Sequence, residues 1–420
     1  MKHVADFSEI LPLIRAHATI VLHSGCAEPG YLSRELAAHA HEFDHVRLLA
    51  FMPMGPAPYA ARAWPGHLSI SSFLPGKGLR KATAEGRVEL LQQPVSRIAA
   101  FFASSITADL LFLRLSPPDA SGRMSLGISV DYMRTVLDQD PIVVAEIDPH
   151  MPRTRGDTTV LPEQVDYVLE SRDSPQIVVA EAAGDIDRRI AENVAGLVRD
   201  GAVVQTGIGA LPDLLLGQLG HLRDLGIHTG IVTDAMRPLL ESGVVTNALK
   251  SVFPGKCVTT TAAGTQAFYD FLHENDDFAF HPCALTHDRA LLASIDNLCA
   301  INSVLEIDLD GQINAERLDG RIIAGPGGLP DFVAGAAGSK GGVSVIALRS
   351  TSPKGDRNNI RVKLAPDAPA SVSVSADRID FVVTEFGVAH VKNLSAAARA
   401  EAIIAVAHPD TRADLRRGIA

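Results

Sequence analysis

The sequence AVVQTGIGALPDLLLGQLG, residues 202–220, contains the elements that decide the fold. Residues 202–205 are mostly apolar and branched, as in a buried strand, and residues 207–212 carry the glycines and the proline of a tight turn. Leu215 and Leu219 then recur at helical spacing. A strand, a tight turn and a helix in this order form the repeating unit of a parallel sheet covered by helices.

The same order of features occurs near the start of the chain. Residues 19–22 (TIVL) read as a strand and residues 24–29 (SGCAEP) as a turn, and Leu32 and Leu36 continue at helical spacing. In both places the two leucines follow a proline at the same spacing. The chain therefore contains an internal repeat of this unit.

The repeat predicts an α/β fold made of two related open α/β domains, which we place at residues 1–185 and 186–420. Because such units are common, chance recurrence remains the alternative. Three other short apolar runs are further strand candidates, namely residues 109–113, 142–145 and 343–348. The polar residues 170–176 (ESRDSPQ) are typical of a linker.

The composition limits the classes of partner. With 420 residues, 46% of them hydrophobic, the chain is long enough for two or three globular domains. A net charge of -11 argues against nucleic acid, although it does not exclude a locally basic pocket. The four cysteines form no CxxC pair, so neither a zinc site nor a disulfide framework is expected. The start lacks the pattern of a secretory signal and no apolar run is long enough to span a membrane, so we expect a cytoplasmic protein.

Glycine-rich turns are the first candidates for a ligand site. Residues 207–213 lie between a predicted strand and a predicted helix, and residues 325–332 form a second turn, followed by Ser339-Lys340-Gly341-Gly342. Glycines let backbone N–H groups approach an anion or form an oxyanion hole. A plain turn and a surface loop are the respective alternatives.

Other polar clusters favour structural explanations. His39, His41 and His45 match no usual metal-ligand spacing and indicate a solvated helix end. Cys26 has no base near it in the sequence, which favours a small buried residue over a nucleophile. Residues 350–357, with two basic side chains, could contact phosphates, but a basic surface loop is the simpler interpretation.

Taken together, segments spread along nearly the whole chain resemble the acetyl-CoA hydrolase/transferase family, which includes the 4-hydroxybutyrate CoA-transferases. Many short pieces in one order are more specific than any single motif. These pieces are residues 116–119 with 122 and 125–127, 151–154 with 156–157, 207–213, 228–229 with 234, 301–303 with 308–309 and 311–312, 325–332 with 339–342, and 384–390.

The resemblance implies two α/β domains with the active site in the cleft between them, and CoA held mainly by the second domain. It implies CoA as a substrate, no permanently bound cofactor, no metal, a small carboxylate as a second substrate and a homodimer. The residues that match the family's first CoA loop are Gly207, Ile208, Gly209, Ala210 and Leu211. Those in other segments that line the CoA site are Asn302, Gly325 and Lys340.

The resemblance also assigns the chemistry. In such transferases a glutamate attacks the acyl-CoA thioester, and a turn that matches Gly327 and Gly328 holds the thioester oxygen. The glutamate follows a His-Ser or His-Thr pair, and this chain has His228 and Thr229 followed by Gly230. The chain therefore departs from the family at the nucleophile.

This departure leaves three hypotheses. In the first, Gly230 opens space for a water that hydrolyses the thioester, with Asp234, Glu306 or Glu385 as the base. The same space could admit a bulkier substrate, including one cleaved at a carbon–carbon bond. In the second, the protein is a non-catalytic CoA-binding regulator or partner subunit. In the third, a carboxylate from elsewhere in the chain supports ordinary transfer.

Overall fold

A computed structural model describes residues 1–179, 182–364 and 372–418 of the chain. The chain divides into two compact units. The first comprises Met1–Val179, Val258–Thr286 and Ile323–Gly327, and the second comprises Ala180–Cys257, His287–Ile322 and Gly328–Ala420. Because compact units need not coincide with domains that fold independently, the extents 1–185 and 186–420 stay a prediction.

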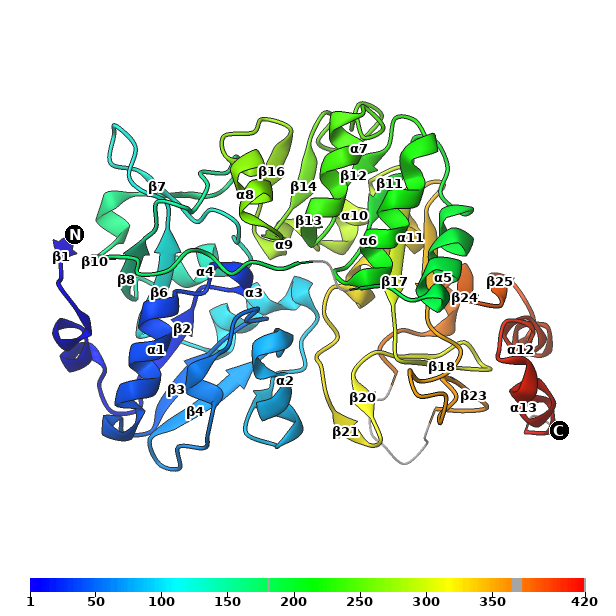
Figure 1. The fold of residues 1–420 in the computed structure, drawn as a ribbon, viewed down its shortest axis with the longest axis horizontal. Coiled ribbons are helices and arrows are strands. Elements are labelled where there is room, and N and C mark those ends of the chain that lie inside the picture. Colours follow the sequence, from blue (N-terminus) through cyan, green and yellow to red (C-terminus); the bar gives the residue numbers. More distant parts are fainter. Residues whose placement is uncertain (180–181, 365–371, 419–420) are drawn as a thin grey trace. The chain divides into compact units, whose positions relative to one another are not determined.

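The first unit contains a sheet in which each pairing is parallel (Figure 1). In spatial order its strands are β1 (Lys2–His3), β10 (Tyr167–Glu170), β8 (Ile142–Ile147), β6 (Leu110–Leu115), β2 (Thr19–Leu22), β3 (Val46–Leu49), β4 (Leu68–Ser72) and β5 (Glu89–Leu90). The helices of this unit are α1 (Gly30–His39), α2 (Gly76–Ala84), α3 (Val95–Ser105), α4 (Met133–Leu137), α8 (Gln266–Leu272) and α9 (Cys283–Thr286). Short strands complete it: β7 (Met124–Ser125) with β9 (Thr159–Val160), β15 (Thr261–Ala263), and β16 (Phe278–Phe280) next to β14 (Cys257–Thr259).

Burial explains why these segments become strands. All six residues of β6 are buried, so this strand is covered on both faces, as is usual in parallel sheets. Leu32 and Leu36 on α1 join Ile20 and Leu22 of β2 in one hydrophobic core. The turn between β2 and α1 is therefore fixed by packing on both sides.

The second unit contains a smaller sheet, parallel except at its last pair (Figure 1). Its strands in spatial order are β12 (Gly226–Ile227), β11 (Val203–Gln205), β17 (Leu298–Ser303), β22 (Val343–Ala347), β24 (Phe381–Thr384) and β25 (Gly387–His390). The helices are α5 (Asp185–Ala195), α6 (Ala210–Gln218), α7 (Arg237–Glu241), α10 (Arg289–Ala293), α11 (Leu329–Gly338), α12 (Ala396–Ala405) and α13 (Arg412–Arg417). The remaining strands are β13 (Ile231–Thr233), β18 (Glu306–Asp308), β19 (Ile313–Asn314), β20 (Arg317–Leu318), β21 (Arg321–Ile322) and β23 (Ile360–Arg361).

Five strands of each sheet share one spatial order, which supports the predicted internal repeat. In the first unit these five strands lie in the order β10-β8-β6-β2-β3. The strands β4 and β5, which come between β3 and β6 in the chain, extend the sheet beyond β3 and are left out of this comparison. Counted from β11, five strands of the second unit lie in the order β24-β22-β17-β11-β12. In both sheets the first strand lies between the second and the third, and the later strands follow on the side of the third. The predicted α/β fold is confirmed, and the predicted strands at 109–113, 142–145 and 343–348 correspond to β6, β8 and β22.

This strand order creates a topological switch point in each sheet. At such a point neighbouring strands continue into connections on opposite sides, and ligands bind there at the carboxyl ends of the strands. In the second unit the switch point lies between β11 and β17. No helix in the described part of the chain could span a lipid bilayer.

Candidate active site

The switch point of the second unit is marked by a pair of polar side chains. Gln205 ends β11 and Asn302 lies next to the end of β17. The amide of Asn302 donates to Gln205 Oε1 at 3.1 Å, and the Gln205 amide lies 3.4 Å from Asn302 Oδ1. The reciprocal contact joins the two strand ends and places Asn302, which the resemblance assigns to the CoA site, at the edge where ligands bind.

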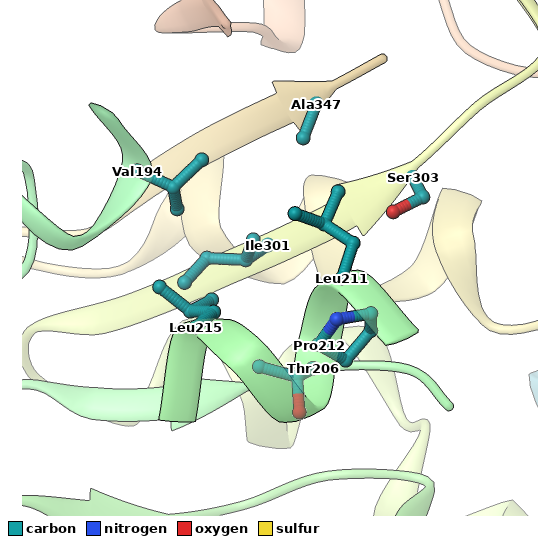
Figure 2. A pocket seen from close by; sticks show the side chains of 8 residues that line it. All are labelled: Val194, Thr206, Leu211, Pro212, Leu215, Ile301, Ser303 and Ala347. Carbon is teal, nitrogen blue, oxygen red and sulfur yellow. The ribbon is translucent and has the colours of Figure 1, made fainter. Parts of the chain in front are cut away.

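A small apolar pocket lies beside this pair. Figure 2 shows Leu211 and Leu215 reaching from α6 toward Ile301 on β17. The complete lining is Val194, Thr206, Leu211, Pro212, Leu215, Ile301, Ser303 and Ala347. Its walls come from β17, the end of β22, α5, the residue that follows β11 and the first turns of α6, so the end of the predicted CoA loop and the predicted strand ends meet here.

The predicted CoA loop lies between β11 and α6. Gly209 has φ +119°, which side-chain-bearing residues rarely adopt, and it directly precedes Ala210, the first residue of α6. Within the described part of the chain, no atom lies within 4 Å of a β-carbon built on Gly207 or Gly209. The space beside Gly207 and Gly209 is therefore open to a ligand, next to the positive end of a helix.

Gly230 follows β12 at the same edge of the sheet. The Thr229 hydroxyl donates to the carbonyl of Thr206 at 2.7 Å, which ties this turn to the predicted CoA loop. A β-carbon built on Gly230 would lie 2.8 Å from Nε2 and 3.0 Å from Cε1 of His287, closer than real side chains approach. The imidazole of His287 therefore occupies the direction in which a side chain at position 230 would extend.

This contact corrects one expectation from the sequence. Removing the side chain at position 230 was expected to open space for water or for a bulkier acyl group. His287 lies in that direction instead, so a side chain at position 230 would require the ring to shift, and the argument from space alone for a larger substrate or carbon–carbon cleavage fails.

The His287 ring lies between two glycines. A β-carbon built on Gly328, which precedes α11, would also lie 2.8 Å from His287 Nε2. The ring meets Phe332 on α11 edge to face, with centroids 4.9 Å apart. Burial lowers the pKa of His287 to about 4, against the opposing charge of Asp331, so the imidazole is neutral near pH ~7.

Asp331 supplies a negative charge that acts on this ring. It is fully buried on α11, and its Oδ1 accepts from Arg289 Nε on α10 at 2.9 Å. The ion pair compensates the buried carboxylate. His287, Asp331 and Arg289 thus form a polar cluster inside the second unit, next to Gly230 and Gly328.

The other two glycines of the predicted oxyanion turn belong to the first unit by packing. A β-carbon on Gly325 would collide with the carbonyl oxygen of Phe73, so this position admits only glycine. Gly327 has φ +60°, and its carbonyl accepts from the backbone N–H of Val95 at 3.1 Å. The assignments of Gly325 to CoA and of Gly327 to the oxyanion hole stay predictions.

Two of the predicted bases are held by other side chains. Glu385 accepts from the backbone N–H of Ser350 at 3.0 Å and from its hydroxyl at 2.6 Å. Glu306 accepts from Arg361 at 2.9 Å and from Asn314 at 2.9 Å, so both of its oxygens are engaged. These hydrogen bonds indicate a structural role for both carboxylates.

The third predicted base, Asp234, begins a short helical turn after β13. It lies near Asp213 on α6, whose pKa is raised by burial and further by the negative charge of Asp234. Thr233 donates to Asp213 Oδ1 at 3.0 Å, which opposes that rise. Asp234 stays a predicted base, and Asp213 is an additional acidic group at this edge.

Lys340 is placed apart from the other predicted CoA ligands. It lies in the turn between α11 and β22, at the amino end of that strand, whereas Gly209 and Asn302 lie at carboxyl ends. Its side chain is 88% exposed and lies 3.9 Å from Asp296. The assignment of Lys340 to CoA stays a prediction that its position in the sheet does not support.

The equivalent place in the first unit is filled by the protein's own side chains. After β2, the hydroxyl of Ser24 donates to Asp131 Oδ2 at 2.5 Å, and Ser129 donates to the same oxygen at 3.0 Å. His23 contacts the carbonyl of Ser129 at 2.7 Å. All four residues are buried, so this switch point is closed by an internal polar network.

Two alternatives from the sequence are resolved by burial and position. Cys26 is buried, as predicted, and burial raises its pKa to about 12, which disfavours the reactive thiolate. His45 does not join His39 and His41 but stacks on His17, with ring centroids 5.3 Å apart.

His287 is the residue that the sequence interpretation missed. It is one of 15 histidines, it belongs to no motif, and it lies far along the chain from Gly230. Only the folded structure brings its ring to both glycines.

Known proteins resemble this chain over nearly its full length. Residues 1–180 match the acetyl-CoA hydrolase/transferase N-terminal domain, and residues 264–419 match the C-terminal domain of the same family. The 4-hydroxybutyrate coenzyme A transferase of Clostridium kluyveri is 33% identical over 403 residues, which cover 96% of this chain and 94% of that protein.

Solved structures agree. RipA from Yersinia pestis aligns with a TM-score of 0.91 at 30% identity, covering 99% of this chain and 96% of its own. The 4-hydroxybutyrate CoA-transferase of Porphyromonas gingivalis aligns with a TM-score of 0.83 at 27% identity, covering 100% and 97%. The chain therefore belongs to the acetyl-CoA hydrolase/transferase family and is an enzyme of the acyl-CoA transferase or hydrolase class.

Proposed function

We propose that the protein hydrolyses acyl-CoA thioesters to free CoA and a carboxylic acid without a glutamyl intermediate. One observation carries this proposal. Position 230, which by resemblance holds the nucleophilic glutamate, is a glycine whose side-chain direction is occupied by the His287 ring. A carboxylate cannot extend from this position unless that ring moves.

The second unit offers the other parts that hydrolysis needs. The open space beside Gly207 and Gly209 and the N-terminus of α6 suit the phosphates of CoA. Gly328 lies at the N-terminus of α11, where a backbone N–H can stabilise the oxyanion of a tetrahedral intermediate. We propose CoA as a transient substrate at this edge of the sheet and a homodimer as the assembly.

Two other functions remain outcomes of the test rather than the proposal. Transfer to a second acid requires a carboxylate nucleophile, and two of the three carboxylates suggested by the sequence, Glu306 and Glu385, are engaged by other groups of the protein. A non-catalytic CoA-binding regulator would keep the loop without the chemistry.

The test is an incubation of the purified protein with short, branched, aromatic and β-oxo acyl-CoAs, with and without acetate or succinate. Chromatography and mass spectrometry identify the products. The proposal predicts free CoA without any added acid. New acyl-CoA that appears only with the acid would mean transfer, and CoA binding without turnover would mean a regulator.

A further inference from the structure

We propose that His287 is the catalytic base of this enzyme and that its Nε2 activates the water that attacks the thioester. The proposal rests on the proposed hydrolase function and deepens it by naming the group that replaces the missing carboxylate. It depends on the position of one nitrogen relative to two turns of the second unit.

The first argument is geometric. Nε2 lies 2.8 Å from the β-carbon position of Gly230 and 2.8 Å from that of Gly328. By resemblance, the first position carries the nucleophile and the second contributes to the oxyanion hole. A group that touches both positions lies beside the place where the thioester carbonyl must react.

The second argument concerns why glycine occupies both positions. Gly328 has φ −85°, and Gly230 has no φ in the left-handed region, so the backbone would accept other residues at either place. A side chain at either place would instead require the His287 ring to shift. The two glycines and the histidine therefore form one steric unit, and the ring is packed against them as an inserted group.

The third argument is the charge of the ring. Burial holds the pKa of His287 near 4, so the imidazole is unprotonated and neutral around pH ~7. It can therefore accept a proton from water. The charged group that acts on it is Asp331 on α11, which raises this pKa and is itself paired with Arg289 on α10 at 2.9 Å. Asp331 can stabilise the imidazolium that forms in the reaction.

The fourth argument is shielding. Only 3% of His287 is exposed, so bulk solvent and a large second acid are kept from the nitrogen. A single water carried in beside the substrate suffices for hydrolysis. Transfer would need room for a second carboxylate at the same place.

The reaction balances with these groups alone. The water oxygen bonds to the thioester carbon while its proton moves to His287 Nε2, which gives a tetrahedral oxyanion. The C–S bond then breaks, the CoA sulfur leaves with the electron pair, and the proton passes from Nε2 to that sulfur. The products are free CoA and the carboxylic acid, and the histidine is neutral again.

The deciding experiment compares hydrolysis by the wild type with that by His287→Asn and His287→Gln. Both variants keep a polar side chain of moderate size, so at least one should fold, as checked by circular dichroism and thermal unfolding. We expect kcat to fall by about 10²–10⁴-fold with KM changed by less than about 3-fold, since general base catalysis contributes this much. His221→Asn, an exposed histidine of the same unit, is the matched control and should keep full activity.

The pH profile separates a base from a packing residue. The wild-type kcat should fall at acid pH as His287 is protonated, and the residual activity of His287→Gln should lack that fall. A folded His287→Gln with wild-type kcat would overturn the role of His287 and leave hydrolysis intact. Absence of hydrolysis in the wild type would overturn the proposed function and this inference together.

Discussion

At the scale of single residues, the site is defined by one contact that couples positions far apart in the chain. His287 Nε2 lies 2.8 Å from the β-carbon position of Gly230, so we expect the effects of substitutions at these two residues on stability to be coupled. The resemblance identified Gly230 because a motif surrounds it. Position 287 carries no motif, and since side-chain packing at this distance depends on the complete fold, the sequence alone could not reveal the contact.

A double-mutant cycle tests this coupling through stability. Gly230→Ala adds only a β-carbon and should destabilise the protein by about 1–3 kcal/mol, because the ring must shift. In a His287→Ala background the same change should cost much less, with a coupling energy of about 0.5–3 kcal/mol by urea unfolding. Gly207→Ala, where the β-carbon meets open space, is the control. Additive effects of the two changes would show that the ring does not occupy this place.

Glu28 allows a second prediction, on pH dependence. It is buried, accepts from Ser33 and Tyr59, and its pKa is raised by burial to about 7 from 4.5. The Glu28 carboxyl loses its proton near pH 4.5 in the unfolded state and near pH 7 in the folded state. The free energy of unfolding of the wild type therefore falls as pH rises from 4.5 to about 7. Glu28→Gln should remove that loss. The free energy of unfolding of the variant minus that of the wild type should therefore increase by about 2–3 kcal/mol from pH ~5 to pH ~8.

The measurement is urea unfolding of both proteins at the two pH values. Glu163→Gln, at an exposed position, should show no such change. A stability difference between Glu28→Gln and the wild type that is the same at both pH values would contradict the raised pKa.

At the scale of elements, the strands were predictable and their order was not. Short apolar runs identified β2, β6, β8, β11 and β22, because buried parallel strands need apolar side chains on both faces. The runs do not say which strand neighbours which, since that depends on crossovers and on buried polar groups. One such group is Arg114 on β6.

Arg114 joins three segments of the first unit. Its Nη1 donates to Asp148 Oδ2 at 2.7 Å and to the backbone carbonyl of Asp173 at 2.8 Å, and its Nη2 lies 3.7 Å from Glu146 on β8. Asp173 belongs to the stretch that was predicted to be a linker. The contact shows why that polar stretch is ordered next to the sheet.

Replacement of Arg114 should therefore be severe. Arg114→Ala leaves Glu146 and Asp148 as buried carboxylates without their partner, which should cost about 3–5 kcal/mol of unfolding free energy. Arg34→Ala, which removes an exposed ion pair to the same Asp173, should cost less than about 1 kcal/mol. Similar losses for both in urea unfolding would show that Arg114 is no more important than a surface charge.

At the scale of the whole molecule, the repeat predicted from two leucine-bearing units corresponds to two sheets in which five strands share one order. The two switch points differ in the residues that surround them. His23, Ser24, Ser129 and Asp131 close the one in the first unit, whereas glycines and a small apolar pocket surround the one in the second. The sequence did not indicate that residues 258–286 and 323–327 pack with the first unit, because they carry no boundary signal.

The central claim is that this family member cleaves thioesters without a protein carboxylate as nucleophile. The most direct test is the intact mass of the protein, quenched rapidly while it turns over an acyl-CoA in the absence of any added acid. We predict that free CoA accumulates while the protein mass stays unchanged. A protein that gains the mass of CoA less one water, the mark of a glutamyl- or aspartyl-CoA thioester, would contradict the account.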